Sequence, residues 1–280
     1  TGKRYWYWNS RGRSINALDY LIQIRGYGLV DAVHTLVGGE IQQILERRST
    51  PEANYIPREQ EKKAFSLPWA RRCATAAVSY LQQRGISGDV ISRCVRLGLF
   101  YEARYKGEEV CVFVGKDDTG KAKFACMRSI TGKLRKDVYG SDKMYSFCYP
   151  PQNPNSRHVA VFEAPIDALS HATLQELEGW KWDGYRLSLG GTSHVALIAF
   201  LERHPEIRRV NLYMDNDLGG LKNARRIKAM LHENPRFKHI QVGINPPRIG
   251  KDYNEKLLHI REQIKDRQLP CRQKQAAISI

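Results

Sequence analysis

Residues 159–167, VAVFEAPID, and residues 210–220, VNLYMDNDLGG, decide how this chain folds. Each stretch opens with a short apolar run and then reaches carboxylates, which are Glu163 in the first and Asp215 and Asp217 in the second. Short apolar runs of this kind are typical of strands that are buried on both faces of a parallel sheet. The two stretches therefore predict two strands of one α/β sheet. Their acids would lie at the carboxyl edge, where such sheets bind ligands.

The sequence around these stretches alternates between apolar runs and helical patterns. The expected strands are 159–162, 185–189, 209–214 and 239–244, each followed by a helical pattern. This alternation favours a parallel sheet that is covered by helices. We therefore expect an α/β domain over residues 158–269, with its last helix at 254–269. Residues 270–280 are expected to form a frayed tail.

The sequence before residue 158 has a mixed character. A helical pattern begins at Trp69 and a second one follows near Val90, while residues 108–130 form a hairpin pattern around the turn DDTG. Residues 144–149, MYSFCY, are expected to form a short strand. The predicted divisions are a small strand-and-helix segment at 1–48, a polar linker at 49–68, a basic α+β subdomain at 69–150 and a second linker at 150–157.

The charge of the chain points to a polyanionic partner. The net charge is +16 over 280 residues. Residues 1–158 hold 26 Lys and Arg against 15 Asp and Glu, whereas residues 159–280 hold 19 against 14. An excess of this size favours nucleic acid, although a generally basic surface is the simpler alternative. The first half is therefore expected to make the larger electrostatic contact.

Several classes of protein are not expected. The six cysteines form no C-x-x-C pair, which indicates thiols in a reducing compartment rather than a disulfide framework or a zinc site. No apolar run approaches the roughly 18 residues of a membrane span, and no signal peptide is recognisable. We therefore expect a cytoplasmic location and no membrane partner. The start without Met suggests a fragment.

The acids at the expected sheet edge suggest a metal site. Carboxylate oxygens are the ligands that Mg²⁺ prefers, and the ion is usually shared with the phosphates of a substrate. Asp167 lies in the first turn of the helix after Glu163, and Asp252 follows the strand at 239–244. Each acid also has an ordinary alternative role in a turn or as a helix N-cap.

A second group of residues is expected to contact phosphate. Gly190 and Gly191 form a turn between a strand and a helix, where backbone N–H groups can approach an anion, although such a turn is as often only a connection. Lys251 stands beside Asp252 and is assigned to nucleotide or nucleic-acid binding.

Four motifs, EAPIDAL, LGGT, YMDNDLGG and GKDYNE, occur in this order and together resemble a Toprim domain. The resemblance is strongest to bacterial DnaG-type primases and to the primase-like Toprim proteins of plasmids and integrative elements. It extends upstream to SYLQQRGISGDVISRCVRLGLF and to the hairpin segment, and more weakly to the first helices. It covers about residues 4–48 and 70–265.

The resemblance implies metal-dependent nucleotidyl transfer with Mg²⁺ or Mn²⁺. It assigns catalysis and metal binding to Glu163, Asp215 and Asp217, with Asp167 and Asp252 as supporting metal ligands. It places Arg128 on a basic ridge that meets template or nucleotide phosphate, with Lys143 as a looser candidate. The implied partners are a single-stranded DNA or RNA template and NTPs, together with a helicase or a relaxase. The implied role is replication or transfer of a mobile element.

The chain also departs from the family pattern. The zinc-ribbon C-x-x-C would fall on Trp8 and Arg11, so the amino-terminal segment is expected to be a degenerate ribbon that binds no zinc. Asn254 replaces the last acid of the family's third motif, and Ala164 replaces a glycine. Two alternatives follow, a Toprim nuclease that cleaves DNA or RNA and a non-catalytic nucleic-acid-binding protein.

Overall fold

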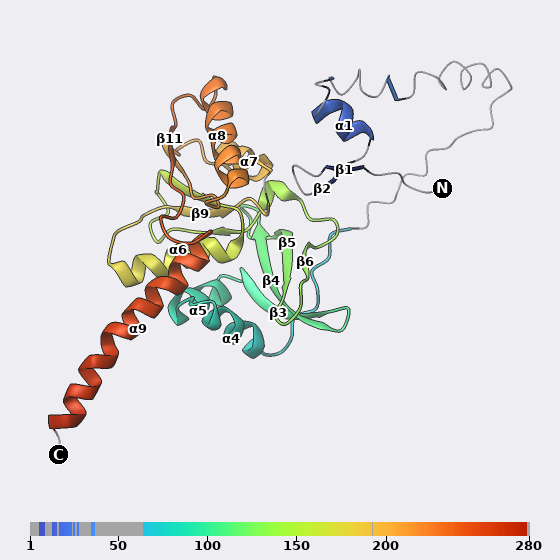
Figure 1. Cartoon of the computed structure of the whole chain (residues 1–280). Helices are drawn as coiled ribbons and strands as arrows, with labels where there is room; N and C mark the ends of the chain where they lie inside the picture. The colour runs from blue at the N-terminus through green and yellow to red at the C-terminus, as the bar shows by residue number, and fades with distance from the viewer. Residues whose placement is uncertain are drawn as a thin grey trace, which may run out of the picture. The chain divides into compact units, whose positions relative to one another are not determined.

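The computed structural model describes residues 6–8, 13–15, 17–23, 25, 27, 35–36, 64–191 and 193–278. The chain divides into two compact units, Thr1–Glu61 and Lys62–Ile280 (Figure 1). Most of the expected linker at 49–68, and Arg11 of the expected degenerate ribbon, lie outside the described residues.

The first unit contains a short hairpin and a helix. Strand β1 (Trp6–Trp8) pairs antiparallel with β2 (Arg13–Ile15), and helix α1 (Ala17–Gln23) follows. The predicted segment of strands and helix at 1–48 thus contains both kinds of element among its described residues. The zinc-ribbon interpretation of this segment stays a prediction.

The second unit begins with two helices that pack against an antiparallel sheet. The helices are α4 (Thr75–Gln83) and α5 (Gly88–Arg96), and the sheet has the order β3 (Phe100–Tyr105), β4 (Glu108–Lys116), β5 (Ala122–Ser129) and β6 (Arg135–Asp137). The predicted hairpin is β4–β5, while β3 and β6 were not predicted. The first helix begins at Thr75 rather than at Trp69, which is 94% exposed.

The middle of strand β4, Val110–Val114, is apolar because each face of the strand packs against a different core. Cys111 and Phe113 join the cluster formed with α4 and α5, whereas Val110, Val112 and Val114 join a second cluster with β5. Successive side chains of a strand point to opposite faces, so a strand with two buried faces needs a continuous apolar run. The basic subdomain is thereby fixed to the rest of the unit through its central strand.

The second sheet is largely parallel and has the order β11-β10-β8-β9-β7. Its parallel strands are β8 (His158–Phe162), β9 (Tyr185–Ser188), β10 (Arg209–Leu212) and β11 (Gln241–Ile244). All four were predicted. The edge strand β7 (Cys148–Tyr149) runs antiparallel to β9. The predicted strand at 144–149 is shorter, because Lys143–Tyr145 form a 3₁₀ turn that Asp142 caps by accepting from the Met144 N–H.

Helices cover both faces of this sheet (Figure 1). Helices α6 (Pro165–Glu178) and α9 (Tyr253–Ile278) share a core with Ala160 and Phe162, whereas α7 (Val195–Arg203) and α8 (Leu218–Glu233) share one with Val159 and Val161. Alternate side chains of β8 therefore pack into two different cores, and the predicted parallel α/β sheet covered by helices is confirmed. Among the described residues, none of the helices has the length and apolar character needed to cross a membrane.

The last helix is longer than the sequence suggested. A frayed tail was expected after Pro270, but α9 continues to Ile278. The residues after Pro270 include Arg, Gln, Lys and Ala, which are good helix formers and so are compatible with the continued helix.

Candidate functional site

The predicted acids converge at the carboxyl edge of the parallel sheet. Glu163 directly follows β8, Asp215 follows β10, and Asp252 ends the loop after β11. Together with Asp167 they line a cavity of about 650 Å³. The opposite wall comes from the basic subdomain. It contains Arg128, Arg135 and Lys136.

Glu163 has an unsatisfied carboxylate oxygen. Its Oε1 atom is buried and has no hydrogen-bond partner. Burial raises the pKa of this carboxyl, and the neighbouring Asp215 raises it further. A buried polar atom without a partner is costly unless a ligand satisfies it. The side chain is therefore arranged for a donor or a cation that the polypeptide does not supply.

Asp215 and Asp217 both pair with one cationic side chain of the protein, Lys251. The Lys251 Nζ atom lies 3.6 Å from Oδ2 of Asp215 and 3.4 Å from Oδ2 of Asp217. The two loops are also tied by their backbones, since the Asn216 N–H donates to the Lys251 carbonyl at 2.7 Å. The assignment of Lys251 to nucleotide or nucleic-acid binding stays a prediction, and in the structure its ammonium group pairs with these two acids.

The surroundings of Asp215 and Asp217 shift the pKa values of these two carboxyls in opposite directions. Burial and the Asp252 carboxylate raise the pKa of Asp215, whereas the Gly220 N–H and Lys251 lower the pKa of Asp217. Asp217 is also the N-cap of α8, because its Oδ1 accepts from the Gly220 N–H at 2.8 Å. Its ordinary structural role and its proposed metal role are compatible, since Oδ2 faces Lys251 instead.

Asp167 is the most buried acid of the site, with an exposed fraction of 7%. Burial, with the neighbouring Asp252 and Asp215 carboxylates, raises the pKa of Asp167 to about 8. Its Oδ1 accepts from the Asn254 N–H at 3.3 Å. Asp252 caps α9 by accepting from the Glu255 N–H at 2.8 Å.

The side chain of Asn254 takes part in a buried polar cluster. Its amide nitrogen donates to the Arg84 carbonyl at 2.7 Å and to the Ser170 hydroxyl at 3.0 Å, and its oxygen accepts from Arg84 Nη1 at 2.9 Å. These three bonds use both N–H groups of the amide and one lone pair of its oxygen. Asn254 therefore acts as a clamp between α4, α6 and α9, and the missing charge at this position has a structural explanation.

Sequence reasoning missed Arg84, which lines the cavity and joins the two halves of the site. Its guanidinium carbon lies 5.7 Å from the centre of the Tyr80 ring, and the Tyr80 hydroxyl accepts from Nε of Arg128 at 3.0 Å. The local signal was an arginine beside Gly85 at the turn after a helix. That signal does not reveal which distant residues the arginine meets.

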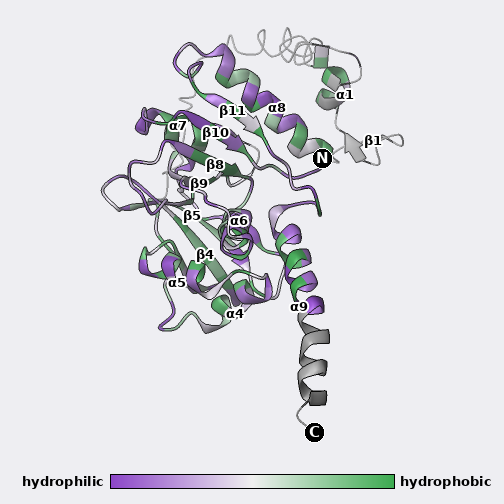
Figure 2. Ribbon diagram, turned by 90° about the vertical axis from the view of Figure 1, so that its left-hand side faces the viewer, coloured by the Kyte–Doolittle hydropathy of each residue, from purple (hydrophilic) through white to green (hydrophobic). Residues whose placement is uncertain are grey.

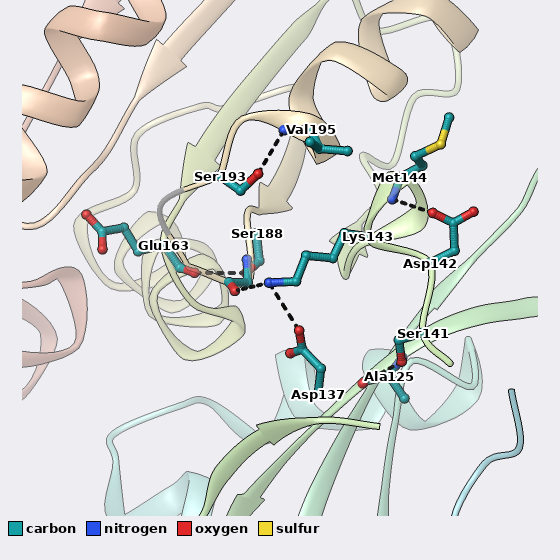
Figure 3. A network of polar contacts seen from close by, with 11 residues as sticks. Ala125, Asp137, Ser141, Asp142, Lys143, Met144, Glu163, Ser188, Ser193 and Val195 are labelled. Atoms are coloured by element: carbon teal, nitrogen blue, oxygen red, sulfur yellow. Dashed lines mark hydrogen bonds and ion pairs between the residues drawn. The ribbon is translucent and has the colours of Figure 1, made fainter. Parts of the chain in front are cut away.

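Lys143 and the glycine turn form a strut between the two subdomains (Figure 3). Lys143 Nζ donates to the Gly190 carbonyl at 3.2 Å and pairs with Asp137 at 3.1 Å. The N–H groups of Gly190 and Gly191 donate to the Ser188 hydroxyl and to the Glu163 carbonyl, at 3.1 Å each. Both glycines line the cavity, but these donors are used within the protein. Their phosphate-binding role stays a prediction.

The carboxylates of the site are suitable ligands for a divalent cation, but the structure does not bring them together into a complete metal site. Among the described residues, no three His, Cys, Asp or Glu side chains form a group that could hold a metal ion. The unsatisfied Glu163 oxygen and the two acids paired with Lys251 are the type of ligand that an oxygen-coordinated cation requires. A cation bound by the Oδ2 atoms of Asp215 and Asp217 would compete with the Lys251 ammonium group.

Comparison with known proteins identifies two parts of the chain. Residues 160–257 match the model of a family described as Toprim-like. Residues 79–153 match a family described as a protein of unknown function, DUF3991. The Toprim resemblance predicted from the carboxylate motifs is confirmed by the first match. An uncharacterized protein of Bacillus anthracis is 24% identical over 180 residues, which cover 62% of this chain. The chain spans about half the length of this curated relative.

Solved structures with a similar fold include three primase fragments. The primase fragment of the bacteriophage T7 primase-helicase protein has 21% identity and a TM-score of 0.49, with 73% of this chain and 81% of that chain covered. The Escherichia coli primase catalytic core has 18% identity and a TM-score of 0.46, with coverages of 68% and 70%. The Aquifex aeolicus primase, in its zinc-binding and RNA polymerase domains, has 12% identity and a TM-score of 0.46, with coverages of 91% and 70%.

Proposed function

We propose that this chain is a primase-like, metal-dependent nucleotidyltransferase that acts on single-stranded nucleic acid. One observation carries the proposal. Acids from three strand ends line one wall of a single cavity, and cationic side chains of the basic subdomain line the other. Nucleotidyl transfer needs such a pairing, because metals and cations must neutralise the triphosphate while the reacting groups are held in line.

Each wall has a distinct role in this proposal. Glu163, Asp215 and Asp217 would hold Mg²⁺ or Mn²⁺, with Asp167 and Asp252 behind them. A bound divalent cation would neutralise the triphosphate and align it for attack. Arg84 and Arg128 would contact phosphates of the template or the incoming nucleotide. Lys251, which lines the same cavity, would then be free to contact a phosphate as well.

The wider setting is inferred from the resemblance. The proposed partners are a single-stranded DNA or RNA template and NTPs, with a helicase or relaxase as a protein partner. The proposed role is priming during replication or transfer of a mobile element in the cytoplasm. The net charge of +16 supports a polyanionic template.

The direct test is a templated synthesis assay. Purified protein is incubated with single-stranded templates, NTPs and Mg²⁺ or Mn²⁺, and the products are separated by size. Short oligomers are expected from the wild type, and none from Asp215→Ala. Asp266→Ala, which removes an exposed acid on α9, is the matched control and should retain activity. Absence of product over a broad set of templates would refute polymerase activity.

A non-catalytic nucleic-acid-binding protein is the second candidate, and one observation favours it. Lys251 already pairs with Asp215 and Asp217, so part of their negative charge is balanced without a bound metal. Calorimetric titration with Mg²⁺ separates the two functions. Binding that disappears in Asp215→Ala supports the enzyme, whereas no binding in either protein supports the alternative. Cleavage of DNA or RNA without NTPs would instead indicate a Toprim nuclease.

A further inference from the structure

Helix α8 carries a row of cations on its outer face. Its sequence, LGGLKNARRIKAMLHE, has no acid before Glu233. Lys222, Arg225 and Arg226 are exposed and Lys228 is half-buried, while the opposite face is packed into the core. These four residues are called the α8 basic face. Purple segments alternate with green ones along the helix (Figure 2).

The protein leaves most of this charge unneutralised. Among the described residues, none of the ion pairs or side-chain hydrogen bonds involves Lys222, Arg225 or Lys228. Arg226 donates to Asn223 Oδ1 at 2.9 Å. Like charges at i, i+3 and i, i+4 spacing repel one another and weaken a helix. A row of this kind suits a polyanion that neutralises several charges at once.

The α8 basic face begins close to the candidate site. Asp217 is both an acid of that site and the N-cap of α8. A helix rises 1.5 Å per residue, so Lys222 to Lys228 lie roughly 8 to 17 Å along the helix from Asp217. The row is about 9 Å long, which corresponds to two or three stacked nucleotides at about 3.4 Å each. Leu218, which is 89% exposed, lies between the acids and the row and offers an apolar contact for a base.

We propose that the α8 basic face is a second nucleic-acid contact surface. It is separate from the basic wall that contains Arg128 and Arg135. It would hold the backbone of the strand beyond the carboxylate edge, while the basic subdomain holds the strand on the other side of the cavity. The proposal rests on the proposed function and adds a surface on the less basic half of the chain.

The test measures how salt affects binding. A fluorescent single-stranded oligonucleotide is titrated with protein at several salt concentrations, in EDTA and without NTPs, and anisotropy gives the dissociation constant. The double variant Lys222→Ala/Arg225→Ala removes two cations. If both contact phosphate, the slope of log affinity against log salt should fall in magnitude by about 1.4, since each phosphate contact on a single strand contributes about 0.7. Affinity should fall by more at low salt than at high salt.

A matched double variant controls for net charge. Lys265→Ala/Arg267→Ala removes two cations from the exposed surface of α9 and should leave the slope near the wild-type value. Thermal melts of both variants show whether the fold is intact. Equal slopes for the two variants and the wild type would overturn the proposal. The proposal would also be overturned if Lys222→Ala/Arg225→Ala kept the wild-type slope but no longer bound poly-glutamate. That result would assign the surface to an acidic protein.

The assay also separates this proposal from the proposed function. Binding in EDTA without NTPs needs no catalysis, so a reduced slope supports the α8 basic face even where no primer is made. A wild-type protein that fails to bind any single strand would contradict both.

Discussion

Replacing Asn254 by Asp tests whether this position is a clamp or a latent metal ligand. The substitution restores the acid that the family pattern has at this position and changes the side chain by one atom. In the structure the amide nitrogen donates to the Arg84 carbonyl at 2.7 Å and to the Ser170 hydroxyl at 3.0 Å. A carboxylate oxygen in its place can donate neither bond. We therefore expect Asn254→Asp to destabilise the protein and to add no metal affinity.

The magnitude follows from these contacts. The Ser170 hydroxyl can rotate and donate to the new carboxylate, and Arg84 Nη1 can still pair with its other oxygen. The Arg84 carbonyl, however, loses its donor and faces a negative oxygen. An unsatisfied buried acceptor costs about 1–3 kcal/mol, so a loss of about 2 kcal/mol in unfolding free energy is expected. For a unit of this size, that loss corresponds to a decrease in Tm of roughly 4–8 °C.

Urea denaturation and calorimetry with Mg²⁺ measure the two parts of this prediction. Asn155→Asp is the control, because it makes the same chemical change at an exposed loop position. Wild-type stability in Asn254→Asp, together with tighter Mg²⁺ binding, would refute the clamp and make residue 254 a metal ligand.

Two further predictions concern the same edge of the sheet. The raised folded-state pKa of Asp167, about 8 against 3.8, means that this group stabilises the fold most below pH 4 and loses that contribution as the pH rises to about 8. In urea denaturation with EDTA, the free energy of unfolding of the wild type should therefore decline by up to about 1.4 kcal/mol per pH unit, and Asp167→Asn should lack this decline. Parallel plots of unfolding free energy against pH for the two proteins would contradict the prediction. In Gly220→Ala the new Cβ would lie 2.2 Å from the Asp215 carbonyl oxygen, so the Asp215 loop must move. Overpacking of this kind costs about 1–3 kcal/mol, so the Tm of Gly220→Ala should fall by several degrees. Gly219→Ala is the control and should melt close to the wild type, because the nearest neighbour of its new Cβ is the Asp217 side chain at 3.2 Å. Equal decreases in Tm for the two variants would be inconsistent with the steric cause.

The parallel sheet could be predicted because its strands are short apolar runs with acids at their ends. The period of the pattern placed β8 to β11 within a few residues, and strand polarity alone placed Glu163 and Asp215 at one edge. Strands β3 and β6 were missed for physical reasons. Charged residues interrupt β3 at Glu102 and Arg104, and β6 consists of Arg135–Asp137, so neither shows a clear apolar alternation.

By itself, the sequence determined the α/β fold of the carboxy-terminal part and the identity of its acidic edge. Both depend on local patterns of polarity, which a single chain displays directly. Only the tertiary structure decided which side chains pair with the polar and acidic groups at that edge. The Arg84–Asn254 bond joins residues 170 positions apart, and Lys251 reaches Asp215 only because two loops pack together. Such contacts depend on distances between elements rather than on any periodic pattern, because side chains meet where packing brings their backbones together.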